Sequence, residues 1–258
     1  MQPAAVGVMI EFRDVSYRVA GTPVLSGFNL QVQSGETLVL LGRSGSGKTT
    51  LLKLVNRLLP PTSGKILVKG VPNGELDIIR LRRSIGYVIQ DGGLFPHFTV
   101  ERNIGLVPRI EGWPQDRISL RVQELLQMVG MDTRTASRYP HQLSGGQRQR
   151  VGVARALAAD PEMLLMDEPF GALDPLTRND LQGEFLSLQQ QLAKTVVFVT
   201  HDLREAVRLG SRIAFLDAGR LVTVLPPTEF LQCTDPLVSA YVRAFGDAVV
   251  SNPNRGTT

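Results

Sequence analysis

Cysteine, long apolar runs and dense runs of charge are scarce in this sequence, and each of these absences excludes a structural feature or a class of partner. Cys233 is the only cysteine, which excludes a disulfide within the chain and fits a reducing compartment. No apolar run approaches the roughly 18 residues that a membrane-spanning helix needs. Residues 1–9 lack the basic segment of a secretory signal, so we expect none.

Charge of the two signs is nearly balanced. The net charge at pH 7 is +4, from 28 Lys and Arg residues against 24 Asp and Glu residues. The basic residues form no dense tract, so nothing in the sequence favours nucleic acid as a partner. The hydrophobic share of 43% is typical of a globular protein.

Short stretches with strand patterns alternate with longer helical patterns. Apolar or alternating residues predict strands at 10–17, 29–33, 38–41, 65–69, 85–89, 163–166, 195–200 and 212–216. Helices are expected within 98–159 and at 176–192. One helix face carries Ile118, Val122, Leu125, Leu126 and Val129, which we expect to be buried. This alternation indicates an α/β fold with a mostly parallel sheet and an inserted helical block.

The most informative motif is residues 42–49, which match the phosphate-binding pattern G-x-x-x-x-G-K-[ST]. The motif follows an apolar strand and opens onto a helical pattern, which is the context that a phosphate loop needs. Its glycines let successive backbone N–H groups point at anionic oxygens. We expect Lys48 to reach the outer phosphates and the Thr49 hydroxyl to bind Mg²⁺, so the motif predicts a nucleoside triphosphate site.

Two adjacent acids, Asp167 and Glu168, follow the apolar strand at 163–166. Ligands bind at the carboxyl edge of an α/β sheet, which is where these acids are expected. We expect Asp167 to hold Mg²⁺ and Glu168 to lie beside the γ-phosphate as the base or water-orienting group.

Residues 143–147 read Leu-Ser-Gly-Gly-Gln and lie between the two preceding motifs. Ser144 is suited to cap a helix, and Gly145 and Gly146 allow a phosphate to approach the start of that helix. In this order and spacing, the three motifs resemble those of the ATP-binding cassette (ABC) ATPases. The resemblance covers residues 10–225.

The resemblance implies the fold class and the domain organisation. The expected fold is a P-loop NTPase with a RecA-like, mostly parallel sheet core, an N-terminal antiparallel β part and an inserted α-helical subdomain. The ABC ATPase domain is expected at 8–228, with its core at about 8–92 and 160–228 and its helical subdomain at about 93–159. Residues 229–258 are expected to form a helical tail with a disordered end and no CBS modules.

The resemblance also assigns roles to individual residues. Tyr17 is similar to the aromatic residue that stacks on adenine, and His201 to the switch histidine that contacts the γ-phosphate. The implied catalytic residues are Glu168, His201 and Gln90, and the implied Mg²⁺ ligands are Thr49, Gln90 and Asp167. The implied ATP-binding residues are Tyr17, Gly42, Arg43, Ser44, Gly45, Ser46, Gly47, Lys48, Thr49, Thr50, Gln90, Ser144, Gly145, Gly146, Gln147, Asp167 and Asp174.

The mechanism that the resemblance implies needs two copies of the ATPase subunit. ATP on the phosphate loop of one subunit is covered by Ser144 and Gly146 of the other, in a head-to-tail dimer that hydrolysis reopens. The sequence predicts no membrane-spanning helix, so transport requires separate permease subunits, contacted near residues 90–98 and the helical subdomain. A solute-binding protein is a further expected partner. The expected location is peripheral, at the cytoplasmic face of the inner membrane.

Several stretches are similar to one branch of the family, among them 85–91, 93–97, 103–108 and 139–142. They resemble the ATPase subunits of bacterial importers for quaternary-amine osmoprotectants such as glycine betaine, choline and carnitine. Two alternatives stay open, an importer of a different small solute and an ABC mechanoenzyme without a transport role. A GTPase is disfavoured, because no lysine is followed two residues later by the aspartate of a guanine-reading motif.

Overall fold

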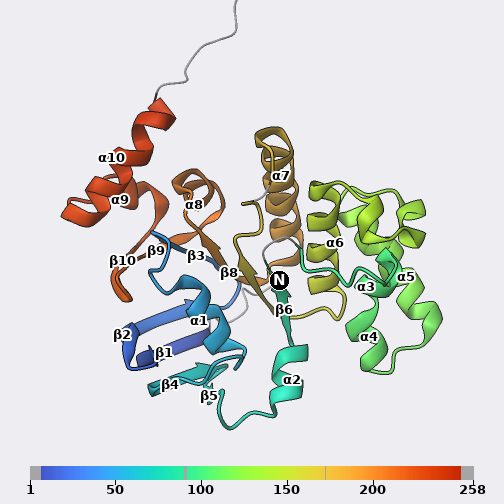
Figure 1. Ribbon diagram of the computed structural model, residues 1–258, viewed down its shortest axis with the longest axis horizontal. Coiled ribbons are helices and arrows are strands. Elements are labelled where there is room, and N and C mark those ends of the chain that lie inside the picture. The colour runs from blue at the N-terminus through green and yellow to red at the C-terminus, as the bar shows by residue number, and fades with distance from the viewer. Residues whose placement is uncertain (1–6, 90–91, 172, 251–258) are drawn as a thin grey trace, which may run out of the picture.

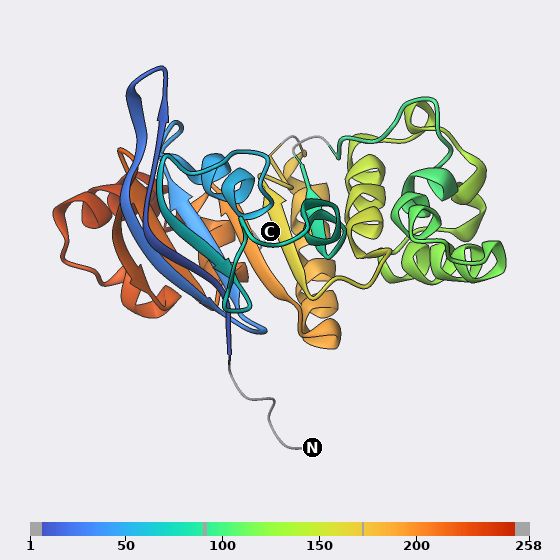
Figure 2. The same ribbon diagram turned by 90° about the horizontal axis from the view of Figure 1, so that it is seen from below.

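Two β-sheets and a block of helices build the protein, seen in a computed structural model in Figures 1 and 2. The structure describes residues 7–89, 92–171 and 173–250. The smaller sheet is antiparallel, with strand order β2-β1-β4-β5. Its strands are β1 (Val8–Val19), β2 (Thr22–Gln33), β4 (Ser63–Val68) and β5 (Val71–Pro72). Strand β1 combines buried residues, such as Phe12 and Val15, with exposed ones, such as Arg13 and Arg18, as expected for a sheet with one solvated face.

The larger sheet has strand order β10-β9-β3-β8-β7-β6, and all its pairs are parallel except β9 with β10. Its strands are β3 (Thr37–Gly42), β6 (Ile85–Val88), β7 (Met163–Asp167), β8 (Thr195–Thr200), β9 (Arg212–Asp217) and β10 (Arg220–Leu225). Every residue of β3 and β8 is buried. Burial on both faces explains why these strands are almost continuously apolar.

Helices cover both faces of the larger sheet and extend beyond one of its edges. They are α1 (Lys48–Val55), α2 (Ile78–Arg83), α3 (Val100–Ile104), α4 (Leu106–Ile110), α5 (Gln115–Met128), α6 (Gly145–Leu157), α7 (Pro175–Leu192), α8 (Leu203–Leu209), α9 (Pro227–Leu231) and α10 (Pro236–Val250). Short 3₁₀ helices span Thr133–Ser137 and Pro140–Gln142. In both views α3 to α6 gather together beyond β6 (Figures 1 and 2). Within the described ranges, no helix has the length and apolar character to cross a bilayer.

The core has two parts, one on each face of the larger sheet. On β3, Val39 and Leu41 belong to the part that contains residues of α6, α7 and α8. Leu38 and Leu40 belong to the part that joins the antiparallel sheet and α1. Helix α1 is therefore packed between the two sheets, which fixes the phosphate loop at the carboxyl edge of β3.

The predicted fold class is confirmed: a mostly parallel sheet is combined with an N-terminal antiparallel sheet and an inserted helical block. The expected apolar helix face is also buried, with Ile118 and Leu125 at 1% and 0% exposure. The domain boundaries remain predictions. The sequence predictions for residues 1–6 and 252–258 concern parts of the chain outside the described residues.

Several elements were missed or shortened in the sequence prediction, among them β5 and α8, and for three others a local reason is clear. Strand β10 has one exposed and five half-buried residues, so its pattern lacks clear alternation. The first half of β2 contains Pro23 and Gly27, which predict a turn rather than a strand. Helix α2 has only six residues and one buried side chain, so it carries almost no helical periodicity.

Candidate functional site

The phosphate loop connects β3 to α1 through tightly packed glycines. Gly47, which caps α1, has φ +96°, a backbone conformation that favours glycine. A Cβ atom at Gly47 would lie 2.6 Å from the Leu25 side chain, and one at Gly42 would lie 2.2 Å from the Leu216 carbonyl oxygen. Neither position has space for a side chain, so both glycines are needed for the loop to reach its shape.

Lys48 is enclosed by this loop, with 5% of its surface exposed. Its Nζ donates hydrogen bonds of 2.8 Å to the carbonyl oxygens of both Gly42 and Arg43. Burial lowers the pKa of Lys48, whereas the nearby carboxylates of Glu168 and Asp167 raise it. The ammonium group is thus held inside the loop by neutral acceptors, which an anionic phosphate can replace.

Asp167 ends β7 and faces the start of α1. Its Oδ1 accepts a 2.8 Å hydrogen bond from the Thr49 hydroxyl. Burial raises the pKa of Asp167; the Thr49 hydrogen bond lowers it, and the charge of Glu168 raises it further. The structure therefore brings together the two described residues that the sequence predicted as Mg²⁺ ligands.

Hard oxygen ligands are what Mg²⁺ prefers, and it commonly takes one or two protein ligands together with substrate phosphates and waters. Thr49 and Asp167 supply a hydroxyl and a carboxylate in direct contact, and this donor set fits the ion. Within 7–89, 92–171 and 173–250, no group of three or more His, Cys, Asp or Glu residues could hold a metal alone. A divalent ion here would depend on oxygens of the nucleotide.

Glu168 and His201 face each other at the ends of β7 and β8. His201 Nδ1 lies 3.3 Å from Glu168 Oε1, and both side chains are partly exposed. The backbone of Glu168 is left-handed, with φ +44°, and its N–H donates to the Val199 carbonyl oxygen at 3.1 Å. Such a conformation is unfavourable for a residue with a side chain, and strained backbone is concentrated at functional sites.

Tyr17 is linked to the phosphate loop indirectly, by Leu25 on the neighbouring strand. It pairs with Leu25 across β1 and β2, and the Leu25 side chain approaches Gly47. The Tyr17 side chain is half-buried. Arg43, Ser44 and Gly45 are exposed at the tip of the loop, whereas Ser46 is buried, so the tip is open to a ligand.

The Leu-Ser-Gly-Gly-Gln segment starts α6 in the helical block. Ser144 caps this helix: its Oγ accepts from the Gln147 N–H at 3.2 Å, and Gln147 Oε1 accepts from the Ser144 N–H at 3.0 Å. Ser144 and Gly145 are exposed, while Gly146 is packed against Thr177 of α7. The predicted capping role of Ser144 is confirmed.

The predicted site residues fall into two separate places within one chain. The phosphate loop, Asp167, Glu168 and His201 meet at the carboxyl edge of the larger sheet. The start of α6 lies apart from α1 in both views, with strands of that sheet between them (Figures 1 and 2). Asp174 caps α7, where its carboxylate accepts from the Thr177 N–H at 3.0 Å. Gln90, for which the resemblance implies a catalytic and Mg²⁺-binding role, lies outside the described residues.

Three residues that the sequence did not predict lie at the histidine loop, the segment that follows β8 and carries His201: Glu205, Arg178 and Tyr241. Glu205 is 4% exposed and accepts hydrogen bonds from Thr200 and Gln182, at 2.6 and 3.2 Å. Arg178 of α7 donates to the Leu173 carbonyl oxygen at 3.1 Å, and Tyr241 of α10 donates to the His201 carbonyl oxygen at 2.5 Å. No motif marks these residues, because their partners come from elements distant in sequence.

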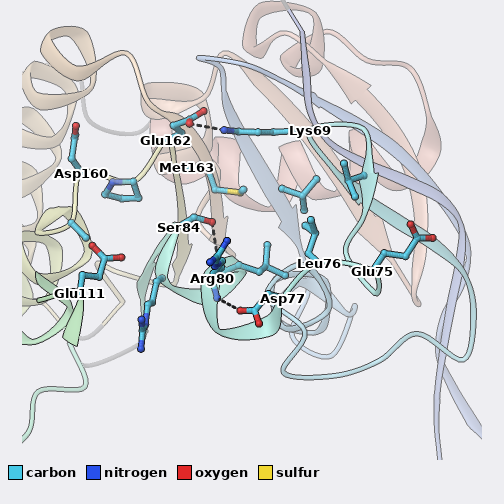
Figure 3. Close-up of a pocket in the computed structure, with 16 residues that line it drawn as sticks. Lys69, Glu75, Leu76, Asp77, Arg80, Ser84, Glu111, Asp160, Glu162 and Met163 are labelled. Carbon is cyan, nitrogen blue, oxygen red and sulfur yellow. Dashed lines mark hydrogen bonds and ion pairs between the residues drawn. The ribbon is translucent and has the colours of Figure 1, made fainter.

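A cavity of about 860 Å³ lies elsewhere, between α2, β4 and the loop that precedes β7 (Figure 3). Its lining mixes acids and bases, including the Lys69–Glu162 ion pair shown by a dashed line. None of the predicted site residues lines it. The cavity is therefore distinct from the candidate nucleotide site.

Comparison with known proteins identifies the class that this fold and site define. The ABC transporter family model matches residues 25–171. The solved dimeric structure of a post-hydrolysis state of the ATP-binding cassette MJ0796, bound to ADP and Pi, has a TM-score of 0.77. It is 33% identical in sequence, over 85% of this chain and 99% of that one.

Two curated relatives are similar at the level of sequence. The glycine betaine/carnitine/choline transport ATP-binding protein OpuCA of Bacillus subtilis (strain 168) is 52% identical over 212 residues, which is 82% of this chain and 56% of the relative. The glycine betaine uptake system ATP-binding protein YehX of Escherichia coli (strain K12) is 48% identical over 237 residues, which is 92% of this chain and 76% of the relative.

The chain belongs to the ABC transporter family, and the matched residues form its ATP-binding domain. The resemblance inferred from three short motifs is thereby confirmed. The chain spans about half the length of several curated relatives that it matches, including 56% of the Bacillus subtilis protein.

Proposed function

We propose that this chain hydrolyses ATP to drive an importer of quaternary-amine osmoprotectants such as glycine betaine, choline and carnitine. The observation that carries the ATPase part is the meeting of Lys48, Asp167 and Glu168 at one sheet edge. The solute class rests on the relatives, which are transport ATP-binding proteins for these compounds. The ATPase domain itself need not touch the solute, so its geometry does not select among them.

Each residue at the sheet edge has a role that follows from its position. Lys48 exchanges its two carbonyl partners for the outer phosphates, which it neutralises. Glu168 orients the attacking water and accepts its proton, while His201, 3.3 Å away, contacts the γ-phosphate. Tyr17 supplies an aromatic face for adenine next to the loop.

Thr49 and Asp167 would hold Mg²⁺, and Gln90 is proposed as a further ligand from the sequence alone. When bound, the ion supplies positive charge that neutralises the phosphate oxygens. The contact between Thr49 and Asp167 supports this assignment, because it already brings the two ligand oxygens together.

The complete site is formed by two copies of the chain. Ser144 and Gly145 are exposed at the start of α6, where a helix N-terminus and its cap can hold a phosphate. They lie apart from the phosphate loop of their own chain, so a second copy must supply them. Two head-to-tail sites then bury two ATP molecules, with Asp174 at the loop that joins them. The solved cassette neighbour is likewise a dimer.

Permease subunits are proposed to dock between the larger sheet and the helical block. A cavity of about 350 Å³ lies there and is lined by Tyr87, Ile89, Phe95 and Leu106 among others. Ile89 and Phe95 are 37% and 41% exposed, which suits a short amphipathic helix from a partner. A solute-binding protein is proposed as a further partner of this complex. Because the permease subunits lie in the membrane, the chain bound to them is proposed to lie peripherally, at the cytoplasmic face.

Two measurements test this proposal. Purified protein should hydrolyse ATP in the presence of Mg²⁺, and Lys48→Ala should lose nucleotide binding, while the exposed control Lys65→Ala keeps both. Deletion of the gene should abolish uptake of labelled glycine betaine, choline or carnitine at high osmolarity. An active ATPase whose deletion leaves all three uptakes intact would contradict the proposed solute class.

A further inference from the structure

Tyr241, on the C-terminal helix α10, is fixed in place against the histidine loop. Its ring is 4% exposed. It packs edge-on to Phe215, with centroids 5.0 Å apart, and stacks on Phe245 at 4.7 Å. Its hydroxyl donates a 2.5 Å hydrogen bond to the carbonyl oxygen of His201. Two aromatic neighbours therefore aim one donor at one backbone acceptor.

The loop that carries His201 is held on both sides of that residue. Thr200 Oγ1 accepts from the Asp202 N–H at 3.0 Å and donates to buried Glu205 at 2.6 Å. Tyr241 holds the carbonyl group of His201 itself through its hydroxyl. The imidazole is then directed at Glu168, 3.3 Å away. The orientation of this ring depends on its own backbone, which Tyr241 holds.

The surroundings keep the Tyr241 hydroxyl in its donating form. Burial raises its pKa well above the usual value, and the carboxylates of Asp202 and Glu168 raise it further, against an opposing effect of Arg43. The hydroxyl reaches the backbone of His201, whose side chain lies 3.3 Å from Glu168. The raised pKa therefore favours the protonated hydroxyl, which is the form that donates to His201.

We propose that Tyr241 is a positioning residue for hydrolysis, which couples α10 to the histidine loop. The inference rests on the proposed ATPase function. Precise placement of a group beside the reacting phosphate affects the chemical step more than ATP binding, which the phosphate loop supplies. A displacement of α10 therefore changes the turnover rate while leaving the affinity for ATP unchanged.

Tyr241→Phe tests this, because it removes the hydroxyl and keeps the ring. Loss of one neutral hydrogen bond should lower kcat about 3- to 10-fold, with KM and the Kd for ATP unchanged. Val238→Ala is the matched control, since it removes buried packing of α10 and keeps Tyr241 with both of its aromatic neighbours. It should lower the melting temperature and leave kcat near that of the wild type.

An NMR measurement separates positioning from general destabilisation. The chain has three histidines, so the Cε1–H signals are few and His201→Ala assigns one of them. In Tyr241→Phe the His201 signal should shift, while those of His97 and His141 stay in place. An unchanged kcat together with an unchanged His201 signal would overturn the proposal. Equal losses of kcat in both variants, in proportion to stability, would overturn it as well.

The same measurements distinguish a failure of the proposed ATPase function from a failure of the positioning role of Tyr241. If the wild-type protein binds no ATP or does not hydrolyse it, the ATPase assignment fails, and the NMR shift still tests the contact between Tyr241 and His201. If the wild type is active and only the Tyr241→Phe arm gives no change, the ATPase assignment stands and the positioning role is wrong.

Discussion

The Thr49 hydroxyl donates a 2.8 Å hydrogen bond to the carboxylate of Asp167, which joins the first turn of α1 to the end of β7. The two residues are 118 positions apart in the chain. Parallel pairing of β7 with β8 and of β8 with β3 brings their carboxyl ends to one edge. The contact therefore exists because the sheet orders these strands.

Thr49→Ala should raise the Mg²⁺ concentration needed for half-maximal ATP hydrolysis about tenfold or more, since it removes one oxygen ligand. Thr49→Ser keeps the hydroxyl and should restore the wild-type dependence. The measurement is a Mg²⁺ titration of the ATPase rate at saturating ATP. An identical titration for the alanine variant would show that Thr49 is not a ligand.

Glu168→Gln should lower kcat about 100-fold or more, because the amide cannot accept the proton of the attacking water. Binding of ATP should persist, since the phosphate loop is untouched. Glu162→Gln is the control, because Glu162 is 63% exposed in a surface pair with Lys69 and should keep full activity. Unchanged turnover in Glu168→Gln would remove Glu168 from the reaction.

Ser144→Ala should abolish hydrolysis while leaving ATP binding by the single subunit intact. It also removes a helix cap, which costs about 1 kcal/mol of stability. Thr99→Ala separates the two effects, because Thr99 caps α3 in the same way, accepting from the Arg102 N–H at 3.2 Å. If both variants lose equal stability and equal activity, the loss of activity comes from destabilisation of the helical block, and Ser144 has no separate role in hydrolysis.

Glu205→Gln should stabilise the nucleotide-free protein at neutral pH. Burial is the main cause that raises the pKa of Glu205, so the folded state binds this proton more tightly than the unfolded chain. The stability gained from the protonated group is present below the unfolded pKa of about 4.3 and is lost as pH rises through the raised folded pKa. The glutamine variant stays neutral throughout.

Thermal unfolding across pH checks this expectation. The melting temperatures of Glu205→Gln and the wild type should agree near pH 4 and separate towards pH 8, with the variant higher. The exposed control Glu229→Gln should follow the wild type at every pH. A variant that is less stable than the wild type at pH 8 would mean that the charged form is favoured in the fold.

Local patterns predicted the phosphate loop and the acids that follow β7, because each of these features depends on residues that are neighbours in sequence. The glycines of the loop and the apolar strand before Asp167 can be recognised in the sequence without knowledge of the fold. Tyr241 is different, since it is 40 residues from His201 and reaches it only when α10 packs on the sheet. Strand β10 escaped prediction because an edge strand needs no apolar alternation.

ATP is proposed to join two copies of this chain at sites that neither copy completes alone. Light scattering of the Glu168→Gln variant, with Mg²⁺ and either ATP or ADP, tests it most directly. We expect the mass of a dimer with ATP and of a monomer with ADP, and loss of the dimer when Ser144→Arg is added. A Glu168→Gln protein that binds ATP and stays monomeric at all concentrations would contradict it.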